Sequence, residues 1–399
     1  MFKKLPIFCN KANDLDSGIR YCVYDRIDVL KDVFESLEPN DIFFDFQYLN
    51  TVHTLPPVGI QPYLVTVEAN ESIIGIVLIQ LTYTRLEDNF RKTPFSDNNT
   101  LEKPITAAKK LILKSVNFNT VVCGNLMITG LNGFYFNESI PESDAFVLAE
   151  KAVNFFTKEF QLHSALVLFK DFNTEQKNMI VPYAEDFTEF QAQPDMKLQL
   201  KGDWNSMEDY LTDLKSKYRV RYNKVRSGKK NFQTRQLQVH EIEAYSIQIQ
   251  ELYRQVSDHA DFNTFILQDG YFSLLKRQLE EKLLFTGYFL DDEMVGFYTA
   301  IINNQRLYAH FLGYKKQLNT AYYLYQNMLY DLVEHGIRLK SSVIDFSRTA
   351  IEIKSTVGAK ACDLHLFLKH TNCFVNTLVG PITGLLKPDQ NYTMRDPFK

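Results

Sequence analysis

The densest group of chemically reactive side chains lies in one short segment, Asp345–Ala359, which reads DFSRTAIEIKSTVGA. A predicted strand ends at Asp345, and open α/β sheets bind ligands at the carboxyl ends of their strands. Arg348 and Lys354 follow, and both side chains suit an anionic substrate. The alternative is structural, because Arg348 and Glu352 are four residues apart and would pair along a helix.

A second candidate lies in the predicted strand Arg306–Gly313, where His310 has the same strand face as Tyr308 and Leu312 if the side chains alternate. A catalytic role requires the strand to line a cleft, and the alternative is a core histidine with satisfied hydrogen bonds. The strand continues into the loop Gly313–Thr320 and then a helix. A helix N-terminus after such a loop suits a phosphate group.

A third candidate is the segment Ser206–Lys230, whose apolar residues recur every three or four positions and predict one amphipathic helix. The basic residues are Lys215, Lys217, Arg219, Arg221, Lys224, Arg226, Lys229 and Lys230. No acidic residue occurs between Leu214 and His240. Such a helix attracts the phosphates of a nucleotide, a coenzyme, an aminoacyl-tRNA or a lipid. The alternative is a solvated basic face.

Several other chemistries lack their motifs. The sequence contains no G-x-x-x-x-G-K-[ST], no G-x-G-x-x-G and no H-E-x-x-H. No serine lies in a G-x-S-x-G elbow, and no catalytic triad can be argued. The five cysteines are scattered without a C-x-x-C pair, which argues against a zinc site and a disulfide framework. We therefore expect no metal, and reduced cysteines in a cytoplasmic protein.

The composition is that of a globular chain. Its 399 residues are 45% hydrophobic and 23% charged, and this length favours two domains. The 44 basic and 48 acidic residues give a net charge of −4, which does not by itself indicate a nucleic-acid-binding protein. The N-terminal residues have no long apolar run, so we expect no signal peptide. No apolar run reaches the ~18 residues of a membrane span, so we expect no membrane insertion.

Two segments predict the same local structure. Tyr63–Thr82 and Leu284–Asn303 each consist of a strand, a polar turn and a second strand that opens with two apolar residues and glycine. In the first half a strand (120–129), a helix (143–160) and a strand (165–169) follow. In the second half a strand (306–312), a helix (320–334) and a strand (342–346) follow, and a last strand (364–369) closes it. We interpret this as a duplicated α/β unit, the alternative being a coincidence of common elements.

The two repeats differ in one long insertion, residues 85–119, which contains a polar loop and a short basic helix over Ala107–Lys114. Such an insertion is either functional or a surface excursion. The join between domains is predicted near Gln191–Trp204, with Asp203 as the N-cap of the next helix. The predicted domains are therefore residues 1–200 and 201–399.

The C-terminal half resembles the GCN5-related N-acetyltransferase (GNAT) superfamily, in its divergent branch of predicted N-acyltransferases. That branch includes BioF2-like and peptidoglycan-biosynthesis proteins and is related to the Fem aminoacyltransferases. Three segments carry the resemblance: the basic helix Leu214–Arg226, the hairpin Tyr288–Ala300 with Val295-Gly296, and Asp345–Ala359, which is similar to a D-F-G…K-x-x-x-G-A signature. The similarity covers about residues 204–370. The N-terminal half matches through the internal repeat, as in tandem-GNAT Fem proteins.

The resemblance implies an α/β (α+β) fold with tandem GNAT-like domains, each a mixed central sheet with flanking helices. The first domain is expected to be degenerate, and the second to transfer an acyl group from a thioester to an amine. One departure is that the usual Q/R-x-x-G-x-G/A pyrophosphate loop is replaced by GYKKQLNT, with the single glycine Gly313. This weakens acetyl-CoA as the donor and leaves another acyl-CoA, an acyl carrier protein or an aminoacyl-tRNA.

The resemblance also implies residue roles. The thioester is expected in a notch between His310–Gly313 and Val343–Asp345, with Asp345 or His310 as the base and Tyr314 or Tyr325 as the acid. The cofactor-binding candidates are Phe311, Leu312, Gly313, Asn319 and Thr320. The candidates for binding an anionic amine acceptor are Arg348, Glu352, Lys354, His259 and Arg219. The loop that contains His259 could instead be a capped helix junction.

Two alternative functions remain open from the sequence. A Fem-type aminoacyltransferase would use aminoacyl-tRNA in modifying a cell-wall precursor, which the basic helix and the altered loop favour. The absence of a recognisable long helical hairpin counts against it. A non-catalytic GNAT-like protein that senses a small anionic ligand is the third hypothesis.

Overall fold

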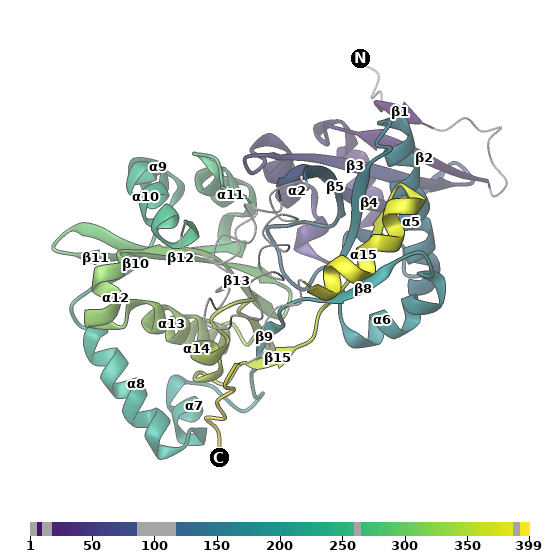
Figure 1. Cartoon of the computed structure of the whole chain (residues 1–399). Coiled ribbons are helices and arrows are strands. Elements are labelled where there is room, and N and C mark those ends of the chain that lie inside the picture. Colours follow the sequence, from purple (N-terminus) through teal and green to yellow (C-terminus); the bar gives the residue numbers. More distant parts are fainter. Residues whose placement is uncertain (1–5, 10–17, 86–116, 259–264, 386–391) are drawn as a thin grey trace, which may run out of the picture.

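The computed structural model describes residues 6–9, 18–85, 117–258, 265–385 and 392–399. The predicted helix Ala107–Lys114 lies outside these described residues. The chain folds into two mixed sheets with helices on their faces (Figure 1).

The first half contains β1 (Phe8–Cys9), β2 (Ile19–Tyr24), α1 (Lys31–Leu37), α2 (Phe46–Thr54), β3 (Ile60–Ala69), β4 (Ser72–Arg85), β5 (Asn117–Cys123), β6 (Phe134–Phe136), α5 (Glu142–Glu159), β7 (Ala165–Phe172), α6 (Thr174–Ile180) and β8 (Thr188–Gln191). The second half contains β9 (Asp195–Gln199), α7 (Met207–Asp213), α8 (Ser216–Lys229), β10 (Gln233–Gln236), α9 (Val239–Ala244), α10 (Ser246–Ser257), α11 (Tyr271–Leu279), β11 (Leu283–Leu290), β12 (Glu293–Asn303), β13 (Arg306–Tyr314), α12 (Lys316–Tyr322), α13 (Leu324–Arg338), β14 (Val343–Asp345), α14 (Ile351–Ser355), β15 (Lys360–Cys362), β16 (His365–His370) and α15 (Cys373–Leu385).

The predicted repeat is present in both sheets. In each, an antiparallel hairpin and a third antiparallel strand are followed by a helix and a parallel strand: β3-β4-β5-α5-β7 and β11-β12-β13-α13-β14. The hairpin turns have left-handed backbone at Asn70-Glu71 and Asp291-Asp292, as two-residue turns that match strand twist require. These local signals explain why the repeat was predictable.

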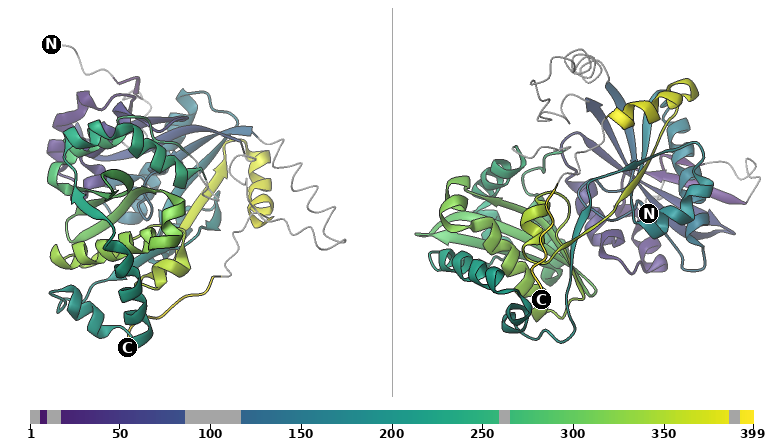
Figure 2. Two further views of the ribbon diagram at one scale, coloured as in Figure 1. Left: turned by 90° about the vertical axis from the view of Figure 1, so that its left-hand side faces the viewer. Right: turned by 60° about the horizontal axis from the view of Figure 1, so that its bottom comes forward.

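The two sheets exchange strands (Figure 2). The first sheet has the order β1-β2-β3-β4-β5-β7-β16-β8, and the second has β10-β11-β12-β13-β14-β9-β15. The expectation that the last strand closes the second half is therefore wrong, because β16 inserts between β7 and β8. Conversely, β9 crosses from the predicted join into the second sheet. The domain boundary at residue 200 stays a prediction. Two strands do not follow it, because β9 precedes residue 200 but lies in the second sheet, and β16 follows it but lies in the first.

One apolar core joins the halves. It contains residues of α1, α2 and β4 together with residues of α10, α11 and β12, with Phe43 against Tyr308 at 4.9 Å between ring centroids. A second core lies between the second sheet and α7, α8 and α13. Figure 1 shows α9, α10 and α11 on one face of this sheet and α8, α12 and α13 on the other.

Three local expectations need correction. The predicted helix Ser206–Lys230 is two helices, because Leu214 and Lys215 have extended backbone and Leu214 forms a bridge with Phe398. The N-cap of α7 is Ser206, in a capping box with Asp209, rather than Asp203. Cys9 and Cys22 face each other on β1 and β2 and form a disulfide, so the expectation that no cysteines pair is wrong.

Candidate active site at the splayed strands

The second sheet opens between its two central parallel strands. β13 pairs with β14 only over Arg306–Tyr308 and Val343–Asp345, and β13 then continues to Tyr314 without this partner. In the first sheet the equivalent strands pair throughout Asn119–Cys123 and Ala165–Phe169. Among the described strands, β5 therefore has a β7 partner up to its last residue, whereas β13 continues from Ala309 to Tyr314 beyond its last β14 partner.

A β-bulge lies in the splayed part of β13. Tyr298 pairs with Leu312 and Ala300 with Ala309, so His310 and Phe311 together oppose Thr299. The Phe311 amide donates to the Thr299 hydroxyl oxygen at 2.9 Å. The bulge breaks the alternation of side chains, and both His310 and Phe311 contact Tyr271. Leu312 packs with the opposite core, so the expectation that His310 and Leu312 have the same face is wrong.

His310 lies in a polar chain that joins the two halves. Its Nε2 is 3.4 Å from the Tyr271 hydroxyl, and its Nδ1 is 3.4 Å from the Thr299 hydroxyl. Tyr271 is hydrogen-bonded to Tyr48, which accepts from the Asn125 amide at 3.1 Å. Burial lowers the pKa of His310 from 6.5 to about 3, so the imidazole is neutral at neutral pH.

This neutral histidine makes stability depend on pH. Between about pH 6.5 and pH 3 the unfolded chain binds a proton at His310 that the folded chain does not, so stability falls as the pH falls. Urea unfolding of the wild type should give a lower unfolding free energy at pH 5 than at pH 7. In His310→Asn we expect this decrease to be smaller by on the order of 1 kcal/mol. The exposed His163→Asn variant is the control. Equal pH dependence in His310→Asn and the wild type would contradict this.

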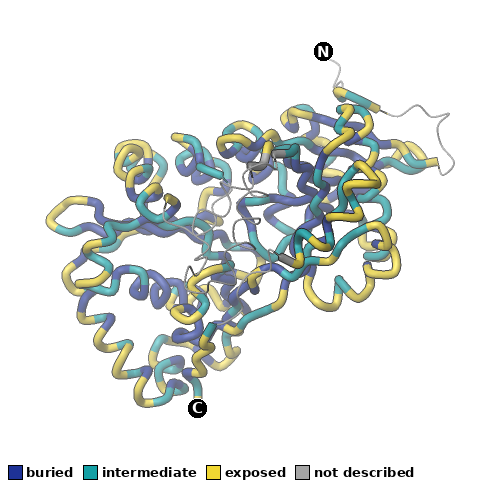
Figure 3. The backbone as a smooth tube through the Cα atoms, in the orientation of Figure 1, coloured by how far each residue is buried: buried dark blue, intermediate teal, exposed yellow. Residues whose placement is uncertain are grey.

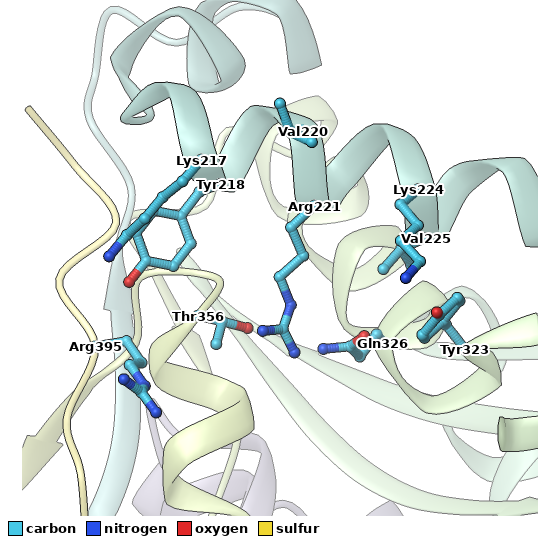
Figure 4. Close-up of a pocket in the computed structure, with 10 residues that line it drawn as sticks. All are labelled: Lys217, Tyr218, Val220, Arg221, Lys224, Val225, Tyr323, Gln326, Thr356 and Arg395. Carbon is cyan, nitrogen blue, oxygen red and sulfur yellow. The ribbon is translucent and has the colours of Figure 1, made fainter.

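A basic pocket of about 610 Å³ lies on the other face of the sheet (Figure 4). Its residues are Lys217, Tyr218, Val220, Arg221, Lys224, Val225, Tyr323, Gln326, Thr356 and Arg395. Tyr323 and Gln326 belong to the segment that follows β13, and Thr356 follows β14 and α14. One wall of the pocket thus comes from elements that follow the two splayed strands, where α/β folds place ligands, and the opposite wall comes from α8.

The charges of α8 divide into two groups. Arg226 and Lys229 contact the Asp331 carboxylate at 2.5 and 2.6 Å, and Lys215 contacts Asp396. The other group consists of Lys217, Arg221 and Lys224, which line the pocket and have no carboxylate partner among the described residues. Figure 3 shows the exposed outer turns of this helix. Some basic residues of this run therefore stabilise the fold through ion pairs, and others are available to bind an anion.

Arg221 is held in place within the pocket. Its guanidinium donates to the Gln326 side-chain oxygen at 2.5 and 3.2 Å, in the amide orientation that hydrogen bonding favours. Figure 4 shows Arg221 pointing from α8 toward Gln326 and Thr356. Lys224 lies over the Tyr323 ring at 5.5 Å. These contacts orient two cations toward the pocket without neutralising either one.

The segment after β14 forms a buried ionic cluster. Asp345 is 3% exposed, and its carboxylate accepts from the Ser347 amide at 2.9 Å. Lys197 Nζ is 3.6 Å from Asp345 and 3.1 Å from Asp195. Burial and the Asp195 carboxylate raise the pKa of Asp345 well above its usual value. Asp345 therefore holds its proton more strongly than an exposed carboxyl.

Arg348 and Lys354 both contact protein groups. Arg348 pairs with Asp171 of β7, which also contacts Lys170 Nζ at 2.6 Å. Lys354 Nζ donates to the carbonyls of Ser347 and Arg348 at 3.1 and 2.5 Å, and burial lowers its pKa to about 7. Their proposed binding of an acceptor stays a prediction. In the structure Arg348 bridges the two halves, and Lys354 holds the loop that carries Arg348.

The loop that carries these groups has strained backbone. Ser347, Thr349 and Ala350 have φ of 62°, 67° and 48°, a region that non-glycine residues rarely adopt. The loop is fixed by Lys354 and by the Ser347 hydroxyl, which donates to Thr129 of the first half at 2.7 Å. Strain of this kind persists where the surroundings over-determine it, and it is common at functional sites.

The two candidate acids lie side by side at the end of β13. Tyr314 and Tyr325 stack with ring centroids 6.2 Å apart, and burial raises the pKa of both hydroxyls. The Asn319 side chain accepts from the Tyr325 amide at 2.9 Å and so caps the start of α13. In place of a glycine-rich loop, the short helix α12 leads into α13.

The remaining candidates are dispersed. Gly313 permits close packing, since a Cβ there would lie 2.4 Å from the Leu252 carbonyl carbon. Thr320 is exposed on α12, and Arg219 donates to the Leu214 carbonyl rather than lining the pocket. Glu352 pairs with Arg395. His259 lies outside the described residues.

The sequence reasoning missed several charged residues. Asp171 lies in the apolar strand β7, where a charged residue is itself an unusual signal. Asp195 and Lys197 lie in β9, whose sequence DMKLQ gives no such signal. Arg395 belongs to the segment Tyr392–Lys399, for which no local pattern indicated a role. In the described part of the chain, no group of His, Cys, Asp or Glu residues could hold a metal ion. No described helix is long and apolar enough to span a membrane.

Comparisons with known proteins agree with this geometry. Residues 218–355 match the acetyltransferase (GNAT) domain family. The fold is similar to the crystal structure of FemX, with 9% identity, 88% of this chain and 98% of that chain covered, and a TM-score of 0.53. Two other matches are a tandem GNAT protein from the clavulanic acid biosynthesis pathway (7% identity, 81% and 87% covered, TM-score 0.44) and L-PGS from Bacillus licheniformis (8%, 85% and 96%, 0.45). No curated protein sequence matched the chain.

Proposed function

We propose that this chain, whose residues 218–355 belong to the GNAT acetyltransferase family, transfers an acyl group from a phosphate-bearing donor to an amine. One observation carries the proposal. The pairing of β13 with β14 ends at Tyr308, and elements that follow these two strands enclose a pocket together with α8, which supplies Lys217, Arg221 and Lys224. The preferred donor is a coenzyme A thioester, with a thioester of an acyl carrier protein as the variant.

In this proposal the donor spans both faces of the sheet. Lys217, Arg221 and Lys224 hold its phosphates in the pocket by charge-assisted hydrogen bonds. The acyl group reaches through the gap beside Ala309–Gly313 to the face where His310 lies. There N–H groups of the part of β13 that has no β14 partner stabilise the developing oxyanion. The Phe311 amide is not one of them, because it donates to Thr299.

The chemical step is aminolysis. The acceptor amine forms a bond to the acyl carbon, the bond from that carbon to the donor sulfur breaks, and the amine loses a proton. His310 is the better candidate for the base, because it lies in the splayed part of β13 and its side chain is partly accessible. The burial that lowers its pKa also makes it a weak base, so the acceptor must bind as the free amine. Asp345 is buried beside Lys197 and Asp195 and is assigned to shaping the loop. Tyr314 or Tyr325 protonates the leaving thiolate.

The first domain is proposed to be structural. Its equivalent strands do not separate, and the first turn of α5 carries Glu142 and Asp144, which repel phosphate. It supports the second domain through Asp171, Thr129 and Tyr48.

A Fem-type aminoacyltransferase is the second candidate, because the similarity to FemX extends over 98% of that chain. In that case the leaving group is the ribose hydroxyl of an aminoacyl-tRNA, and the exposed basic face of α8 binds its phosphates.

Thermal-shift measurements with acetyl-CoA, a long-chain acyl-CoA, free CoA and total aminoacyl-tRNA test the proposal, since a ligand that binds only the folded chain raises its melting temperature. Stabilisation by CoA species, followed by CoA release with an amine acceptor, supports the preferred donor. Stabilisation by aminoacyl-tRNA alone supports the second candidate. If no member of the panel stabilises the chain and acyl carrier protein thioesters are not consumed, acyl transfer is refuted and a ligand-sensing role gains.

A further inference from the structure

One wall of the basic pocket comes from Tyr392–Lys399, a segment far from α8 in sequence that we call the C-terminal strap. Its Arg395 lines the pocket together with Lys217, Arg221 and Lys224. Figure 4 shows the Arg395 guanidinium on the side of the pocket away from Tyr323. The strap therefore adds a fourth cation to the three that α8 supplies.

The strap is anchored on the C-terminal side of Arg395. Phe398 packs against Trp204 and Tyr210, with ring centroids 5.6 and 5.9 Å apart. Gly358 has a φ of 96°, and a Cβ there would lie 2.3 Å from the Phe398 ring, so the contact needs glycine. Pro397 O accepts from the Lys215 amide at 2.8 Å.

The Arg395 backbone is also fixed, because its amide donates to the Ser355 hydroxyl at 2.9 Å. The guanidinium pairs with Glu352, with Nε 3.2 Å from the carboxylate. Both side chains are about half exposed, at 43% and 52%. Arg395 is thus the one cation of the pocket that has a carboxylate partner among the described residues, and that partner is accessible to solvent.

We infer that Arg395 is a phosphate-binding residue of the pocket and that Glu352 holds it ready when no ligand is bound. A ligand phosphate replaces the Glu352 carboxylate on the guanidinium, and Glu352 turns to solvent. The inference rests on the proposed function for the identity of the ligand as a phosphate-bearing donor. Glu352 then acts against binding, because the ligand must compete with it.

The test is the affinity for pyrophosphate and for free CoA, measured by calorimetry on the full chain. Arg395→Gln is expected to weaken binding about tenfold, the loss of one charge-assisted contact. Arg395→Lys should restore part of it. Glu352→Gln should tighten binding by about threefold to tenfold, because it removes the competitor and leaves Arg395 free.

Lys230→Gln is the matched control, since Lys230 is exposed on the same helix but lies outside the pocket. Urea unfolding of each variant shows whether the strap stays docked. The inference is overturned if Arg395→Gln binds like the wild type, if Glu352→Gln weakens binding, or if the wild type binds neither probe. Acyl transfer is scored separately, so pyrophosphate binding that depends on Arg395 without turnover would refute the proposed function alone.

Discussion

Replacing Asp171 by asparagine is expected to destabilise the fold by roughly 3–5 kcal/mol, because it removes the carboxylate that the buried Lys170 and the partly buried Arg348 both contact. Asp171 is 1% exposed, its Oδ2 lies 2.6 Å from Lys170 Nζ, and its Oδ1 pairs with Arg348. It also accepts from the Gly130 amide at 3.0 Å. The loss leaves Arg348 without its ion-pair partner and leaves the buried Lys170 with the Asp195 carboxylate as its remaining electrostatic partner among the described residues.

Urea unfolding of Asp171→Asn measures this effect. Asp28→Asn is the control, because the Arg26–Asp28 pair is exposed and its loss should change the unfolding free energy by less than about 1 kcal/mol. In the double variant Asp171→Asn with Arg348→Gln, the two costs should not add, since both break the same pair. An Asp171→Asn protein as stable as the wild type would show that this cluster does not join the halves.

The second prediction concerns the pocket. The variant Arg221→Glu with Lys224→Glu is expected to weaken donor binding at least about a hundredfold, because two attractive charges become repulsive in one site. Among the described residues neither side chain has a carboxylate partner. The variant loses the Arg221–Gln326 hydrogen bonds and the Lys224–Tyr323 contact, so the unfolding free energy should fall by about 1–2 kcal/mol. The measurement is the affinity for whichever donor stabilises the wild type.

The control is Lys230→Glu, which changes the charge of the same helix outside the pocket. Its donor affinity should fall by less than about threefold at physiological salt, where screening weakens distant charges. If it weakens binding as much as the double variant, net charge rather than the pocket binds the donor. That result would contradict the assignment of the site.

Much of the fold was predictable because its signals are local. The turns at Asn70-Glu71 and Asp291-Asp292 fix the two hairpins, and the order of strands and helices after them revealed the duplication. The strand exchange was not predictable from one half at a time. The segment HLFLKH of β16 predicts a strand, but only tertiary packing decides which sheet this strand joins.

The site was predictable in part for the same reason. The basic run, the short parallel strand before Asp345 and the strand with His310 are continuous segments whose composition is visible. The sequence could not show which basic residues of this run are paired and which are free. Three of them pair with Asp331 or Asp396, and both carboxylates are distant in sequence. Arg219 shows what composition cannot predict. It lies in the basic helix α8, but its guanidinium donates to the Leu214 carbonyl, two residues before that helix begins, and does not line the pocket.

The break at Leu214 has a similar cause. The periodicity of apolar residues continues through it, but the bridge to Phe398 holds Leu214 in extended backbone. The Cys9–Cys22 disulfide likewise depends on the register of β1 and β2, which cysteine spacing alone did not indicate.

Hydrogen exchange in the presence and absence of the donor tests the central claim most directly, namely that the donor binds between β13 and β14. Saturating donor is expected to protect the amides of Ala309–Tyr314 and of the α8 segment Lys217–Lys224. The paired strand segment Asn119–Cys123 of the first sheet serves as the internal reference and should be unchanged. Protection that spares Ala309–Tyr314, or that appears in the first sheet instead, would contradict the claim.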